Sequence, residues 1–131
     1  MAGRINHLIV SVNSYDRARQ FYGWLLPTVG YPKAHEYGEM SGWETTAGSF
    51  WIKQAAKQFT NDTFNKDRVG LCEIAFHADS RALVDAVAKE VEVNGGRILD
   101  PPREYDYAPG YYAVFFTDPD SIKLEVVHIP A

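Results

Sequence analysis

The chain opens with two segments whose hydrophobic periods differ. Residues 6–12 are rich in β-branched and apolar side chains and are typical of a strand. Residues 15–26 predict an amphipathic helix, because apolar side chains recur there at a spacing of three and four residues: Ala18, Phe21, Tyr22 and Leu25. Asn13-Ser14 is expected to cap this helix, and Pro27 and Gly30 to close it.

The same order of elements returns in the second half of the chain. Residues 68–78 predict a strand, and Asp79-Ser80 can cap the helix that follows at 83–93. This helix is expected to end at Asn94-Gly95-Gly96, since glycine readily adopts the left-handed conformation found after many helices.

The segments between these elements are less regular. Residues 31–53 contain short β-like pieces at 42–46 and 49–53, separated by turns that contain glycine. Residues 54–67 are polar and follow neither period, which is typical of a connector. Residues 101–110, Pro-Pro-Arg-Glu-Tyr-Asp-Tyr-Ala-Pro-Gly, are expected to form a long tyrosine-rich loop.

Residues 111–128 predict a β-hairpin, in which Asp118-Pro119-Asp120-Ser121 forms the turn. Side chains alternate along a strand, so Leu124 and Val126 share one face while Lys123 and Glu125 share the other. Glu125 is then a carboxylate in mid-strand among apolar residues. Either it faces solvent beside Lys123, or it is buried and requires a partner.

The two halves superimpose when the sequence is shifted by 66 residues. This shift places His7 over Glu73, Asn13-Ser14 over Asp79-Ser80, and Gly30 over Gly96 without a gap. Each half then has the order strand, capped helix, glycine, further strands. The repeat predicts an α+β fold of two βαβββ modules, about residues 4–57 and 68–131, within a single domain spanning 1–131.

Composition narrows the function classes. A chain of 131 residues suits one domain, and a net charge of −4 argues against a general nucleic-acid binder, which would have a basic face. No apolar run approaches the ~20 residues that a membrane helix needs, so no membrane partner is expected. The single Cys72 cannot form an intrachain disulfide and fits a reducing cytoplasm, where a buried small side chain is its simplest role.

With these elements in place, the chain resembles the vicinal oxygen chelate superfamily, which includes glyoxalase I, bleomycin-resistance proteins and extradiol dioxygenases. The resemblance spans nearly the whole chain. It is carried by Asn-His-Leu-Ile-Val at 6–10, Arg-Ala-Arg-Gln-Phe-Tyr at 17–22, Glu-Ile-Ala-Phe at 73–76, and above all Pro-Gly-Tyr-Tyr-Ala-Val-Phe-Phe-Thr-Asp-Pro-Asp at 109–120 with Leu-Glu-Val at 124–126.

The resemblance implies an open, cup-like sheet around a divalent metal, with ligands from the first and last strands of each module. These positions are His7, Lys53, Glu73 and Glu125. The imidazole and two carboxylates suit Fe, Mn, Ni or Zn. Lys53 departs from the pattern, because a protonated amine has no lone pair to donate.

Two explanations for Lys53 remain open. A slip of one residue in the alignment would present Ile52 or Gln54 in its place. Alternatively, Lys53 neutralises a carboxylate in a cup without a metal. Under both, His7, Glu73 and Glu125 are expected to converge, because their apolar strand neighbours should face the helices: Leu8, Ile74 and Leu124.

Further residues can line the pocket of the cup. His77 shares the strand face of Glu73, although a surface position at the strand end is the simpler interpretation. Arg103, Tyr105, Tyr107 and Tyr111 can bind an anionic or oxygen-rich ligand, while part of this set serves hairpin packing.

Three functions are compatible with these residues. The first is a metal-dependent lyase, isomerase or dioxygenase, whose small substrate chelates the metal through neighbouring oxygens while Glu73 or Glu125 moves a proton. The second is a metal-free module that sequesters a small molecule, and the third is a structural or regulatory domain. The resemblance also implies a homodimer.

Overall fold

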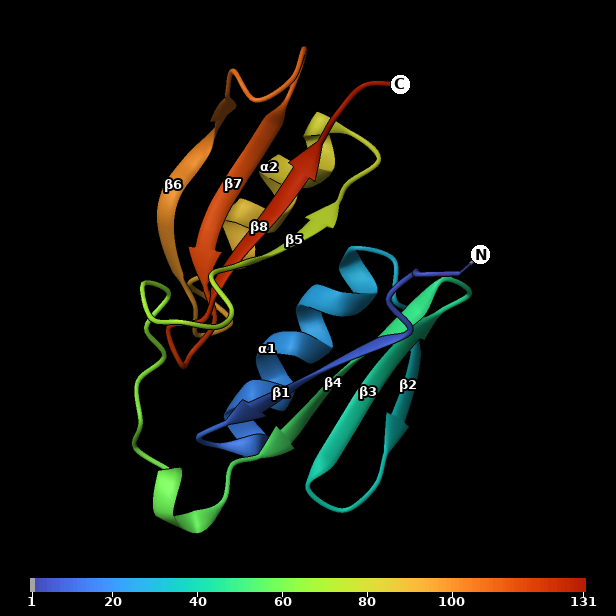
Figure 1. Cartoon of the computed structure of the whole chain (residues 1–131). Helices are drawn as coiled ribbons and strands as arrows, with labels where there is room; N and C mark the ends of the chain where they lie inside the picture. Colours follow the sequence, from blue (N-terminus) through green and yellow to red (C-terminus); the bar gives the residue numbers. More distant parts are fainter. Residues whose placement is uncertain (1) are drawn as a thin grey trace. The chain divides into compact units, whose positions relative to one another are not determined.

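The computed structural model describes residues 2–131 and divides after Asp62 into two compact units, each of which is a βαβββ module (Figure 1). The elements of the first are β1 (His7–Val12), α1 (Tyr15–Thr28), β2 (Lys33–Glu36), β3 (Met40–Thr45) and β4 (Gly48–Gln54), followed by a short 3-10 helix, Lys57–Phe59. Those of the second are β5 (Ile74–His77), α2 (Arg81–Glu90), β6 (Arg97–Glu104), β7 (Tyr112–Thr117) and β8 (Lys123–His128). The predicted α+β class and the two βαβββ modules are confirmed.

Each module has one mixed four-stranded sheet with the same topology. The strand orders are β1-β4-β3-β2 and β5-β8-β7-β6. In both sheets the first and last strands of the module pair in parallel, and the remaining pairs are antiparallel. The last strand of each module therefore lies inside its sheet, next to the first strand.

The first helix begins as predicted and ends later. The Ser14 side chain accepts a hydrogen bond from the backbone N–H of Arg17 at 3.3 Å, which satisfies one free donor of the first turn. The prediction that Pro27 helps close the helix is wrong, because α1 continues to Thr28. A proline in the last turn removes only one intrahelical hydrogen bond, and the chain turns away at Gly30, whose φ of 104° suits glycine.

Two predicted segments of the second module are shorter or earlier than expected. The strand predicted at 68–78 is limited to Ile74–His77, because only these residues pair with β8, from Leu124 to Val127. The helix predicted at 83–93 spans Arg81–Glu90, and its cap is Ser80, which accepts from the N–H of Leu83 at 3.1 Å.

The predicted loop at 101–110 is wrong over its first four residues. Pro101-Pro102 lies inside β6, which is an edge strand of its sheet (Figure 1). An edge strand tolerates proline because one side of its backbone has no partner strand. The pairing with β7 shifts register on both sides of Asp100, as the missing N–H groups require.

The hairpin of β7 and β8 agrees with its prediction. The Asp118 carboxylate holds the turn, since it accepts hydrogen bonds from the N–H groups of Asp120 and Ile122 at 2.8 and 2.9 Å. Side chains of β8 alternate as expected: Leu124 and Val126 are fully buried, and Glu125 belongs to the opposite face. No helix among the described residues is long and apolar enough to cross a membrane.

Candidate active site in the second module

Glu125 is a buried carboxylate at the centre of the second sheet. Its neighbours across the sheet are Ala75 on β5 and Phe115 on β7, and only 4% of Glu125 is exposed. The sequence left open whether Glu125 faces solvent or is buried, and in the structure it is buried. Burial of a carboxylate is costly unless hydrogen bonds or charges compensate it, so its surroundings decide its chemistry.

Tyr111 provides the first compensation. Its phenol donates a hydrogen bond to Oε2 of Glu125. Burial raises the pKa of Tyr111, and the neighbouring Glu125 carboxylate raises it further, so the phenol keeps its proton and acts as a donor. Tyr111 directly precedes β7, and its carbonyl accepts a hydrogen bond from the N–H of Tyr105 at 3.0 Å.

Glu73 and Lys123 complete the polar group. The Lys123 ammonium lies 3.6 Å from Oε1 of Glu73 and 4.9 Å from the centre of the Phe115 ring. The cation beside the two carboxylates in this module is therefore Lys123, which the sequence analysis did not consider for this role. Its position follows from alternation along β8, which puts residues 123 and 125 on one face.

The pKa of Glu125 is raised to about 7 by this environment. Burial is the largest cause, and the adjacent Glu73 carboxyl raises it further through a hydrogen bond and charge repulsion. The Tyr111 hydrogen bond and the Lys123 charge oppose this shift. Near neutral pH, Glu125 is thus present in both its protonated and its ionised form, as a group that exchanges protons with a ligand needs to be.

These groups line a cavity of about 450 Å³. Its wall contains four of the six residues expected in a pocket, without Lys53 and His77, together with the two expected carboxylates: Glu73, Arg103, Tyr105, Tyr107, Tyr111 and Glu125. The sequence analysis missed three charged or aromatic wall residues, Asp100, Phe115 and Lys123. Alternation along the strands is the signal that could have found Phe115 and Lys123, which oppose or flank Glu125.

The aromatic wall is a stack. The Arg103 guanidinium lies 3.9 Å above the centre of the Tyr105 ring, and the rings of Tyr105 and Tyr107 are parallel with centres 5.5 Å apart. Burial raises the pKa of Tyr105. Its hydroxyl oxygen is the single buried side-chain polar atom without a hydrogen-bond partner in residues 2–131.

The first module presents different chemistry at the equivalent positions. In the second sheet Ala75 pairs with Glu125, and the 66-residue shift maps Ala75 onto Ile9, which pairs with Trp51. The counterpart of Glu125 is therefore Trp51, and the alignment of Lys53 with Glu125 is wrong by two residues. Lys53 pairs with Ser11, two residues further along, and is exposed.

Trp51 lies flat against its own sheet. Its ring stacks on His35 and Tyr37 with centres 5.8 and 5.9 Å apart, and its N–H donates to Ser49. A Cβ atom on Gly42 would come within 2.3 Å of the Trp51 ring, so only glycine leaves room for it. This aromatic platform takes the place of a titratable group.

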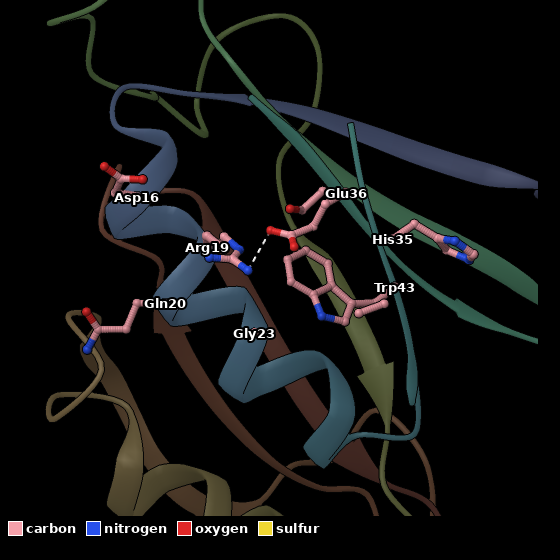
Figure 2. Close-up of a pocket in the computed structure, with 9 residues that line it drawn as sticks. Asp16, Arg19, Gln20, Gly23, His35, Glu36 and Trp43 are labelled. Atoms are coloured by element: carbon pink, nitrogen blue, oxygen red, sulfur yellow. Dashed lines mark ion pairs between the residues drawn. The ribbon is translucent and has the colours of Figure 1, made fainter. Parts of the chain in front are cut away.

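A hollow of about 400 Å³ lies beside helix α1 of the first module (Figure 2). Arg19 and Glu36 form an ion pair of 2.5 Å there, about half exposed, next to the Trp43 ring. Both charges are satisfied by each other and are half exposed, whereas Glu125 is buried. The second-module cavity is the better candidate for an active site.

The metal ligands expected from the resemblance are brought together only in part. Glu73 and Glu125 are neighbours and offer oxygen donors, which suit a divalent cation. No group of three or more His, Cys, Asp or Glu side chains in residues 2–131 is arranged to hold a metal ion. His7 belongs to β1 of the first module, and its convergence with the carboxylates stays a prediction. His77 is exposed on β5 and is not part of the cavity wall.

Comparison with known proteins identifies the family. Residues 4–126 match the model of the glyoxalase/bleomycin resistance protein/dioxygenase superfamily. The chain is 33% identical over 124 residues to YqjT of Bacillus subtilis (strain 168), a protein described as uncharacterized, and the match covers 94% of this chain and 97% of YqjT.

Solved structures agree in fold. A Bacillus halodurans protein superimposes with a TM-score of 0.83 at 29% identity, covering 98% of this chain and 97% of its own. A glyoxalase/bleomycin resistance protein from Albidiferax ferrireducens T118 gives 0.81 at 27% identity, covering 95% and 98%. The match to the family model over nearly the whole length is decisive: this chain belongs to the glyoxalase/bleomycin resistance protein/dioxygenase superfamily.

Proposed function

We propose that this protein is a metal-dependent enzyme of the glyoxalase type, a lyase or isomerase that moves a proton on a small oxygenated substrate. One observation carries the proposal: Glu125, with a pKa of about 7, lines a cavity of about 450 Å³. A base whose pKa lies near the working pH is efficient in both directions of proton transfer. This favours a lyase or isomerase over a dioxygenase, whose chemistry centres on oxygen.

The residues of the cavity have separate roles in this proposal. Ionised Glu125, when it is not bound to the metal, accepts a proton from the carbon next to a substrate carbonyl and returns it later. Tyr111 holds this carboxylate in place through its hydrogen bond. The Lys123 ammonium stabilises negative charge that develops on the substrate oxygen, since it lies at the cavity wall beside Glu73.

A divalent metal would be held by His7, Glu73 and Glu125. Its chemistry would be that of a Lewis acid, which polarises the substrate oxygens. The donor set supports this assignment in part, because the two carboxyls adjoin and repel each other, as the pKa of Glu125 reflects. Trp51 occupies the position in the first module that corresponds to Glu125. Of the two expected ligand positions in that module, only His7 therefore carries a donor atom for a metal.

A metal-free binding module is the second candidate. Its supporting observation is the Lys123–Glu73 ion pair, which already compensates one of the two carboxylates. The cavity would then sequester a small molecule without converting it, and Glu125 would act as a hydrogen-bond partner in either protonation state.

Metal analysis of untagged protein purified without chelator separates the two candidates. The metal-dependent function predicts about one divalent ion per chain, lost in His7→Ala, Glu73→Gln and Glu125→Gln. His77→Ala is the matched control, since His77 is exposed and points to the same side of its strand as Glu73 without lining the cavity. Wild-type protein without stoichiometric metal would contradict the metal-dependent function and leave the binding module.

Proton transfer has its own readout. With 2-hydroxy ketones as probes in deuterium oxide, NMR should detect deuterium at the carbon next to the carbonyl. Glu125→Gln is expected to lower the exchange rate by about 10²–10⁴, the usual contribution of a general base. Exchange that is unaffected by this substitution would assign the base to another residue.

We also propose that the protein works as a homodimer in the cytoplasm. The family resemblance and the single Cys72, which needs no oxidising compartment, support these two proposals. Analytical ultracentrifugation at micromolar concentration should give twice the chain mass of 14.8 kDa. A species of single-chain mass would rule out the dimer.

A further inference from the structure

The cavity of the second module has two chemically distinct ends. One end carries the proton-transfer group around Glu125, and the other carries Arg103 above the Tyr105 ring. Tyr105 bridges them, since its ring centre lies 6.3 Å from that of Tyr111, whose phenol binds Glu125.

Arg103 is a cation without a carboxylate partner. Lys123, the other cation of the wall, is paired with Glu73, whereas no ion pair within the described chain involves Arg103. Its guanidinium donates to the backbone oxygen of Glu104 at a long 3.4 Å and is otherwise held against the Tyr105 ring. Stacking on a ring fixes the plane of a guanidinium and leaves its edge free for a bidentate anion.

Tyr105 gives an independent indication. Its hydroxyl oxygen is buried and makes no well-formed hydrogen bond, the one such side-chain atom in residues 2–131, and the nearby Arg103 lowers the pKa that burial raises. Buried donors without an acceptor are uncommon, and each calls for an explanation in terms of the protein's function. An acceptor oxygen bound at the Arg103 end of the cavity is the partner that this donor lacks.

We infer that the substrate is a small organic acid, whose carboxylate binds Arg103 and the Tyr105 hydroxyl while its oxygen-bearing neighbouring carbon faces Glu125. The placement of the neighbouring carbon at Glu125 rests on the proposed function. The placement of the carboxylate rests on Arg103 and Tyr105 alone, so the two assignments can fail separately. A 2-hydroxy carboxylate carries the exchangeable proton on the carbon next to its carboxylate, and the aromatic wall suits an aryl or alkyl substituent.

Isothermal titration calorimetry with mandelate and mandelamide tests the carboxylate site. The two probes differ only in the charge of the group expected to meet Arg103. Wild-type protein should bind mandelate about tenfold more tightly, the difference between hydrogen bonds to charged and to neutral groups. Equal affinities, or no binding of either probe at millimolar concentration, would overturn the inference.

Substitutions test which residue causes the preference for mandelate over mandelamide. Arg103→Gln should abolish it, and Arg103→Lys should keep part of it, because a lysine retains the charge without the planar fork. Arg97→Gln is the matched control: Arg97 lies on the same strand but lines a different hollow. A preference for mandelate that survives Arg103→Gln would place the anion elsewhere and contradict the assignment.

Tyr105→Phe distinguishes ligand binding from a structural role. The hydroxyl has no partner to lose, so the melting temperature of the free protein should stay unchanged or rise, while mandelate affinity falls severalfold. A lower melting temperature with unchanged affinity would assign the hydroxyl to the fold and overturn its role at the site. If mandelate binds through Arg103 but the wild type exchanges no proton, the carboxylate site stands and the proposed enzymatic function fails.

Discussion

Replacing Glu125 with glutamine is expected to stabilise the metal-free protein at pH 8 by about 3 kcal/mol, at 1.36 kcal/mol for each pKa unit. The folded state raises the pKa of Glu125 from 4.5 to about 7, so it binds the proton more tightly than the unfolded chain does. Stability from this group is complete below pH 4.5 and is lost as the pH rises through 7. Glutamine stays neutral and removes this loss.

Urea unfolding at pH 4 and pH 8, with chelator present, measures the effect. The two proteins should have similar free energies of unfolding at pH 4 and diverge at pH 8. Glu104→Gln is the control, because Glu104 is exposed and paired with Arg81 on the surface. Lys123→Met should move the loss of stability to higher pH, since the Lys123 charge lowers the pKa of Glu125.

The outcome without chelator carries a second piece of information. If a divalent ion is bound to Glu125, the substitution removes a ligand, and the variant should then be less stable than the wild type. A reversal of sign on adding chelator would therefore support the metal-dependent function. An identical pH dependence of both proteins under chelation would contradict the assigned environment of Glu125.

Replacing Gly42 with alanine is expected to destabilise the first module by about 3 kcal/mol, combining the typical cost of overpacking with the loss of aromatic contacts. A Cβ atom at this position would come within 2.5 Å of three Trp51 ring atoms. The ring would have to leave the sheet, and its stacking on His35 and Tyr37 would be lost. Thermal and urea unfolding measure the change.

A double mutant cycle tests the cause. In Trp51→Ala protein the ring is absent, so adding Gly42→Ala should cost little more. Gly23→Ala is the matched control: its Cβ would lie 3.7 Å from Trp43, an ordinary contact, and alanine favours helix α1. Full additivity of the Gly42 and Trp51 substitutions would show that the clash is not the cause.

The order of elements was predictable because it depends on local signals. Ser14 and Ser80 cap their helices 66 residues apart, and the hydrophobic periods around them distinguish strand from helix. The ends of elements were less predictable, since pairing decides them: β5 begins at Ile74, the first of its residues that pairs with β8. Pro101 suggested a loop, yet an edge position lets a proline remain in a strand.

The candidate site was predictable where it follows from alternation along one strand. Glu125 could be assigned to the face opposite Leu124, and its importance inferred from its apolar neighbours. Its partners depend on contacts between strands, which the sequence does not specify. Lys123 was visible next to it, but its pairing with Glu73 requires the register of β5 on β8. The register of β1 on β4, likewise unspecified, separates Lys53 from the counterpart of Glu125.

The two prolines of β6 also bear on how the protein behaves at high concentration. An outer strand with a regular row of free N–H and C=O groups is a template on which other chains can add, the first step of fibril growth. Successive N–H groups of a strand point to opposite sides, so one of the two adjacent prolines, Pro101 and Pro102, removes a donor from this outer row. The register shifts on both sides of Asp100 add to the irregularity of the strand. The diproline segment thus protects this side of the second sheet against aggregation.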